Sequence, residues 1–133
     1  RGNNMENEKL SRREQREEVV KRLYQMDMTS DFSDTESEYE YITEMLDGVS
    51  ENLDFIDDAI SDNLVNWKLN RLTYIDRAII RCAVYEMYFT PLASEIVINE
   101  ALNITRKYSD EGDSKTVKFT NRVLDNIKVF LKK

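Results

Sequence analysis

The sequence predicts an all-α fold, a single compact helical domain of six to seven helices, from three observations. Apolar residues recur at spacings of three and four along most of the chain, and no segment alternates as a half-buried strand would. Only three glycines and one proline occur in 133 residues, so few positions interrupt a helix. The length suits one domain with its own core.

The first two helices are predicted in the N-terminal third. Ser11 and Glu14 have the spacing of a capping box, so a helix is expected to begin there and to run to about Met28. Residues 29–35 are expected to form a loop. The second helix is predicted to end at Gly48 as its C-cap. Its apolar positions are Tyr39, Ile42, Met45 and Leu46.

Further helices follow in the rest of the chain. Ser50 is the expected N-cap of the third helix, and residues 62–70 fit no single element. The helix that begins near Leu72 is the most apolar, with only two charged residues over 78–89, so we expect it in the middle of the bundle. Pro91 marks its exit. The last two helices are predicted over residues 97–108 and 117–131.

The composition argues against an enzyme. The chain contains no histidine, the commonest general base and metal ligand. The single cysteine, Cys82, cannot form an internal disulfide, and a zinc site would have to use carboxylates alone. Three glycines cannot build a phosphate-cradling loop. We therefore expect no catalytic residues, no bound metal and no cofactor.

The N-terminal segment is not expected to act as a signal peptide. The N-terminal segment is polar and no stretch approaches the apolar length of a membrane span, so a cytoplasmic protein without membrane contact is expected. Residues 1–10 are expected to form a disordered tail, in which Arg1 and Gly2 are a remnant of cloning. Residues 11–133 then make up the helical domain.

Charge is unevenly distributed along the chain. The net charge is −7, but residues 27–62 contain thirteen acidic side chains and no basic one, which leaves +6 for the remainder. Because screening limits a charge to about 8 Å at physiological salt, the basic ends can attract a polyanion despite the total. The acidic middle suits a basic protein partner.

The first predicted helix carries an unusual group of cations. On a helical wheel they fall within one arc of about 100°, on the side that later becomes apolar. They are Lys9, Arg12, Arg13 and Arg16. Two explanations stay open: the arginines pair with carboxylates of the acidic segment, or they extend beyond the core as a cationic rim. Arginine favours bidentate contact with phosphate.

Two aromatic residues are candidates for stacking on unpaired bases. Tyr24 lies on the same arc as the arginines, and Phe119 stands beside Lys118 at the start of the last helix. An aromatic ring next to a cation can hold a single-stranded base. Burial in the core is the alternative for both rings.

Charged residues within the apolar helix need partners. Arg81 and Glu86 are about 140° apart on the wheel, so each requires a partner from another helix. Asn99 and Glu100 are the candidates, and the four are interpreted as a structural set. Asp76 precedes the apolar run and is expected at the surface.

Four segments in the same order carry a family resemblance. They are RREQR at 12–16 with LYQM at 23–26, DRAIIRCAVYE at 76–86, INEA at 98–101 with KY at 107–108, and KFTNRVLD at 118–125. Together they resemble the NusB transcription antitermination family over residues 11–131. Each motif alone is modest, but four in register are specific.

The resemblance implies an all-helical domain that binds boxA-type single-stranded RNA of ribosomal RNA operon leaders. It also implies a partner, the small-subunit ribosomal protein NusE, and a complex that helps RNA polymerase resist premature termination. By position, it assigns RNA contact to Arg12, Arg13, Arg16, Tyr24, Lys118 and Phe119. It assigns partner contact to Asp76, and structural roles to Arg81, Glu86, Asn99 and Glu100.

The closing motif departs from the family pattern, which usually reads Phe-Val-Asn-Gly. Thr120 and Arg122 stand at its second and fourth positions. The alternative function is a helical protein-interaction module, or a homodimer that hides the arginine face, without RNA selectivity. A methyltransferase carrying this domain would need a second, cofactor-binding domain for which the sequence has no spare length.

Overall fold

The computed structural model describes residues 9–131, and these residues form six α-helices and one short 3₁₀ helix, η1. The helices are α1 (Arg12–Thr29), α2 (Glu40–Glu51), α3 (Leu53–Asp62), η1 (Leu69–Arg71), α4 (Tyr74–Phe89), α5 (Ser94–Tyr108) and α6 (Lys115–Leu131). Over the described range there is no strand. The predicted all-α fold of six to seven helices is confirmed.

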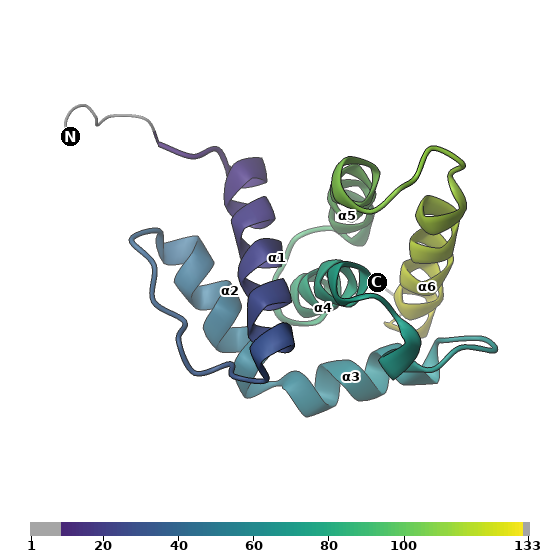
Figure 1. Ribbon diagram of the computed structural model, residues 1–133, viewed down its shortest axis with the longest axis horizontal. Helices are drawn as coiled ribbons and strands as arrows, with labels where there is room; N and C mark the ends of the chain where they lie inside the picture. The colour runs from purple at the N-terminus through teal and green to yellow at the C-terminus, as the bar shows by residue number, and fades with distance from the viewer. Residues whose placement is uncertain (1–8, 132–133) are drawn as a thin grey trace.

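Helix α4 occupies the centre of the bundle, as its composition predicts. Figure 1 shows it nearly end-on, surrounded by α1, α3, α5 and α6. Ile80 and Val84 on α4 have no exposed surface, and Cys82 is a buried free thiol. Burial raises the pKa of Cys82, so this thiol stays protonated and inert.

The capping box predicted for the first helix is present. The Ser11 hydroxyl accepts a hydrogen bond from the Glu14 backbone N–H at 3.1 Å, and the Glu14 carboxylate accepts one from the Ser11 N–H at 2.8 Å. These bonds satisfy two of the free N–H groups at the helix start. Thr73 caps α4 in a similar way by accepting from the N–H of Asp76 at 3.2 Å.

The junction between α2 and α3 differs from the prediction. Gly48 is not a C-cap, since α2 continues to Glu51. The ring of Tyr85 lies directly against Gly48, where any Cβ atom would overlap it. The N-cap prediction for Ser50 is also wrong, because Ser50 lies within α2 and Asn52 separates the two helices. The glycine thus reflects close packing between helices, which a local helix-end signal cannot reveal.

The segment that fitted no single element forms the end of α3, an irregular turn and then η1 (Leu69–Arg71). Asn66 adopts a left-handed backbone conformation there, with φ of 60°. The predicted tail lies mostly outside the described residues; of its last two residues, Leu10 donates a backbone hydrogen bond to the hydroxyl of Tyr39 at 3.2 Å. None of the described helices has the length and apolar character needed to cross a membrane.

Candidate nucleic-acid interface

Arg16 lies at the buried contact between α1 and α4. Its guanidinium donates two hydrogen bonds to the carboxylate of Glu86, at 2.8 and 3.0 Å, and the hydroxyl of Tyr41 donates a third to the same carboxylate at 3.0 Å. The Arg16 side chain is only 7% exposed. Burial by itself lowers the pKa of Arg16, but the hydrogen bonds and charge of Glu86 outweigh this effect and leave the pKa raised.

Burial changes the interpretation of Arg16. The prediction placed it with the RNA-contacting arginines, but both ends of its guanidinium are engaged inside the bundle. Arg16 continues the buried stripe of α1, as its position on the helical wheel predicts. The wheel cannot predict how far the neighbouring helices cover the Arg16 side chain. Arg16 therefore holds α1 against α4, and its buried guanidinium is not accessible to a polyanion.

Arg12 and Arg13 remain at the surface, and we call this pair the cationic rim. The Arg13 side chain is 60% exposed and donates to Glu100 of α5 with two bonds of 3.2 Å. The guanidinium of Arg12 lies 4.0 Å from the centre of the Tyr41 ring. Of the two explanations left open, the rim describes Arg12 and Arg13. Arg16 fits neither, because it is buried and pairs with Glu86 and Glu100, which lie outside the acidic segment of residues 27–62.

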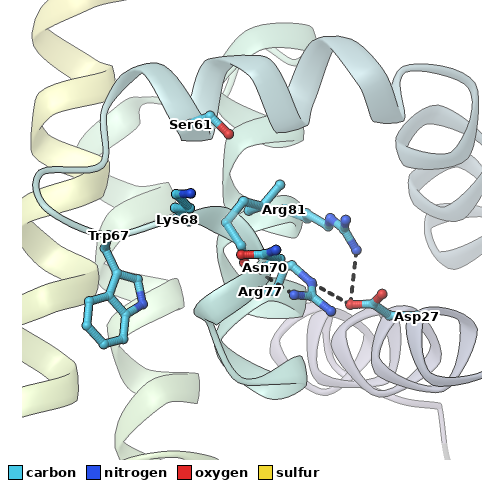
Figure 2. A pocket seen from close by; sticks show the side chains of 8 residues that line it. Asp27, Ser61, Trp67, Lys68, Asn70, Arg77 and Arg81 are labelled. Atoms are coloured by element: carbon cyan, nitrogen blue, oxygen red, sulfur yellow. Dashed lines mark hydrogen bonds and ion pairs between the residues drawn. The ribbon is translucent and has the colours of Figure 1, made fainter.

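A second group of charged side chains links α1, α3 and α4. Arg81 of α4 donates to both carboxylate oxygens of Asp57 in α3, each at 2.9 Å, and lies 3.2 Å from Asp27 of α1. Arg77 donates to the same Asp27 at 2.7 Å. Figure 2 shows Asp27 facing both guanidinium groups while Trp67 projects away from them. Asp27, Arg77 and Arg81 line a hollow of about 640 Å³.

The partners predicted for the two charges in α4 were wrong. Arg81 pairs with Asp27 and Asp57, and Glu86 pairs with Arg16. Glu100 instead bridges Arg13 and Arg16, while Asn99 is exposed on α5. Periodicity showed that each charge needed a partner, but it does not reveal which helices lie next to each other.

The start of α6 and the start of α4 enclose a separate hollow of about 450 Å³. Asp76 and Phe119, which the resemblance assigns to different ligands, both line it, and we call it the α4–α6 hollow. Lys118 is exposed beside it, and Asp76 accepts a hydrogen bond from the hydroxyl of Ser109. One surface thus combines a carboxylate, a partly exposed ring and a cation.

Sequence reasoning missed the aromatic side of this hollow. Trp67 is 52% exposed and Val65 is 62% exposed, and both line the α4–α6 hollow from the loop before η1. The available signal was the only tryptophan of the chain, placed in a polar segment that predicts no buried position. Such an exposed apolar pair commonly marks a binding surface.

The remaining predicted positions divide between core and surface. Tyr24 is half-buried and packs edge-on against Tyr74, with ring centres 6.3 Å apart. At the two positions that depart from the family pattern, Thr120 is fully buried, so it contacts no ligand, and Arg122 is exposed on α6.

The fold and these surfaces define a small helical binding protein, with a cationic rim at one end of α1 and an aromatic hollow between α4 and α6. The described residues include no group of side chains suited to hold a metal ion. The chain belongs to the NusB family, whose family model matches residues 9–128.

Curated relatives are described as transcription antitermination protein NusB. The one from Bacillus thuringiensis (strain Al Hakam) is 38% identical over 130 residues, covering 90% of this chain and 98% of the relative. Among solved structures, T. maritima NusB matches with a TM-score of 0.77 and 35% identity, over 90% of this chain and 92% of that chain. A chain from the crystal structure of antitermination factors NusB and NusE in complex with dsRNA matches with a TM-score of 0.76 and 25% identity, over 90% and 96% of the two chains.

Proposed function

We propose that this protein binds boxA-type single-stranded RNA together with a NusE-type ribosomal protein, and so helps RNA polymerase resist premature termination. The observation that carries the proposal is the α4–α6 hollow, where Asp76 and Phe119 meet on one surface. A chain of the solved complex of NusB and NusE with dsRNA, to which this chain is similar, supports the RNA and NusE parts of the proposal. The proposal includes a non-enzymatic role in the cytoplasm for the helical domain of residues 11–133.

In this proposal the RNA is held by two kinds of contact. Arg12 and Arg13 of the cationic rim bind phosphates, which adds affinity without selecting a sequence. Phe119 stacks on an unpaired base and Lys118 neutralises a neighbouring phosphate, which favours single-stranded RNA. Arg16 holds the rim in place through Glu86 and does not contact RNA.

The protein partner is proposed to occupy the other side of the same hollow. Asp76 offers a carboxylate to a basic partner, while Trp67 and Val65 supply apolar surface that association would remove from water. Because Phe119 lines the hollow as well, RNA and partner would share a boundary, and each would bind better in the presence of the other.

The first test compares Arg13→Gln with Phe119→Ala. Arg13→Gln is expected to weaken boxA-type and scrambled RNA equally, and to flatten the dependence of log affinity on log salt by about 0.7, the value for one phosphate contact on a single strand. Phe119→Ala is expected to reduce the preference for boxA-type RNA. Fluorescence anisotropy over a range of salt concentrations, with and without the partner, measures both effects.

Lys128→Gln is the matched control for Arg13→Gln, because it also removes one positive charge. Lys128 lies about 15 Å along α6 from Lys118 and is not one of the residues proposed to contact RNA. Lys128→Gln should leave RNA binding unchanged. If Lys128→Gln and Arg13→Gln weaken RNA binding to the same extent, only net charge matters and the rim is not a binding site.

A second test addresses the partner. Asp76→Asn removes the charge but keeps an oxygen that can accept from Ser109, so the fold should persist. Association with the NusE-type protein is expected to weaken about tenfold, equivalent to about 1.4 kcal/mol. RNA binding by the protein alone should not change. Isothermal titration calorimetry measures the association.

Asp125→Asn makes the same charge change at an exposed position of α6 and is the control for this test. It should leave partner affinity at the starting value. An unchanged affinity in Asp76→Asn would place the partner elsewhere on the molecule.

A further inference from the structure

A cluster of aromatic rings lies at the C-terminal end of α4, and nothing in the proposed function uses it. The cluster consists of Phe55 from α3 and Tyr85, Tyr88 and Phe89 from α4. Asp76 of the α4–α6 hollow is in the first turn of α4 and Phe89 is its last residue, so the two surfaces are about 20 Å apart along the helix. The aromatic cluster is therefore a separate surface.

The rings touch one another and yet remain open to solvent. The centres of Phe55 and Tyr88 are 5.0 Å apart with perpendicular planes, and Tyr85 stacks on Phe89 at 5.0 Å. Phe55 is 47% exposed and Phe89 is 45% exposed, while both tyrosines are half-buried. Adjacent exposed aromatic side chains of this size are typical of interaction surfaces.

The backbone beneath the cluster restricts its movement. Tyr85 lies against Gly48 of α2, which has no Cβ atom, so the ring rests on the helix backbone. Edge-on contact with Tyr88 and Phe89 holds Phe55 from α3. Rings that are already ordered lose little conformational entropy when a ligand binds.

Carboxylates without cationic partners surround these rings. Glu44, Glu51 and Asp62 are all exposed, and no lysine or arginine among residues 9–131 lies within ion-pair distance of them. Burial is the main cause that raises the pKa of Tyr85, and the charges of Glu44 and Glu51 raise it further. The pKa of Tyr88 is raised in the same way by burial and by the charge of Asp62. Glu44 and Glu51 therefore lie close enough to Tyr85, and Asp62 close enough to Tyr88, for their negative charges to act on these rings.

We propose that the aromatic cluster docks an arginine-containing basic segment of a second protein. A guanidinium can stack on the face of a ring and donate at the same time to a carboxylate at its edge, which suits arginine better than lysine. The unpaired carboxylates repel phosphate, so this surface does not bind RNA. The docked protein differs from the one in the α4–α6 hollow, and both can be bound together because the two surfaces are separate.

The probe for this proposal is a short fluorescein-labelled peptide of alternating arginine and serine, with lysine–serine and glutamate–serine peptides for comparison. The arginine peptide is expected to bind more tightly than the lysine peptide, and the glutamate peptide is expected not to bind. Amide chemical shifts of the intact protein should change in residues 44–62 and 85–92. Equal binding of the arginine and lysine peptides, or shift changes confined to other residues, would overturn the proposal.

Two double variants separate the surface from net charge. Glu51→Lys/Asp62→Lys is expected to weaken the arginine peptide at least tenfold, whereas Glu38→Lys/Glu111→Lys, with the same charge change at exposed sites elsewhere, should weaken it much less. If both double variants lose peptide affinity to the same extent, the loss comes from overall charge, and the proposal is overturned.

Phe55→Ala/Phe89→Ala tests the rings themselves and is expected to weaken the arginine peptide at least tenfold while boxA-type RNA binds as before. Retained RNA binding keeps this result distinct from failure of the proposed function. Peptide affinity that survives loss of both rings would contradict the proposal. So would sedimentation showing self-association that needs these rings, because a second copy would then be the occupant.

Discussion

Replacing Arg16 with methionine is expected to lower the free energy of unfolding by about 3–5 kcal/mol, the range for removing one partner of a buried ion pair. The Glu86 side chain is only 3% exposed, and without Arg16 the Tyr41 hydroxyl is the remaining partner of its carboxylate in this network. Methionine fills much of the space, so the loss comes mainly from the uncompensated charge. Urea unfolding followed by circular dichroism at neutral pH measures it.

Two variants show whether the cause is the unpaired carboxylate. Arg13→Met removes an arginine that is 60% exposed, and is expected to cost less than about 1 kcal/mol. Arg16→Met/Glu86→Leu removes both charges and should recover most of the stability, because an apolar pair of similar volume can replace a buried ion pair. A double variant as unstable as Arg16→Met would assign the loss to packing instead.

Replacing Arg81 with methionine is expected to cost about 3 kcal/mol, the lower end of the same range, since its carboxylate partners are partly exposed. The side chains of Asp57 and Asp27 are 23% and 14% exposed. Arg81 is the cation that joins α3 to α1 across α4, so its loss leaves Asp57 without its bidentate partner. Thermal and urea unfolding both report the change.

Arg77→Met is the comparison for Arg81→Met, since it removes a neighbouring arginine from the same cluster. Asp27 then keeps Arg81 at 3.2 Å, and the expected loss is about 1.5–2 kcal/mol, the lower part of the range for one hydrogen bond to a charged group. The double variant should lose more than the sum of the two, because Asp27 has lost both cations. A larger loss in Arg77→Met than in Arg81→Met would reverse the assigned roles.

The helices were predictable because their signals are local. A spacing of three and four residues marks a buried face wherever it occurs, and the Ser11–Glu14 box lies within one turn. Gly48 and Ser50 show the limit of such signals. A glycine near a helix end predicts a C-cap, but here the ring of Tyr85, far away in the sequence, occupies the space that a side chain would need.

The binding surfaces were harder to predict than the helices. The resemblance singled out Asp76 and Phe119, which the structure brings to one hollow, and it grouped Arg16 with Arg12 and Arg13 although only the last two are exposed. What separates them is Glu86, 70 residues along the chain from Arg16. Such a pairing depends on which helices are neighbours, and periodicity within one helix does not contain that information.

The pairing between Arg16 and Glu86 also bears on how the chain is made. At about 5–20 residues per second, the ribosome needs several seconds to add the 70 residues between them, so α1 emerges from the ribosome before α4. Nine of the 18 residues of α1 are charged, so the segment stays hydrated and has little tendency to aggregate. During the same interval the apolar residues that α1 later buries, Val19, Val20, Leu23 and Met26, are exposed among these charges. The buried ion pair between Arg16 and Glu86 can form only after translation has delivered the carboxylate.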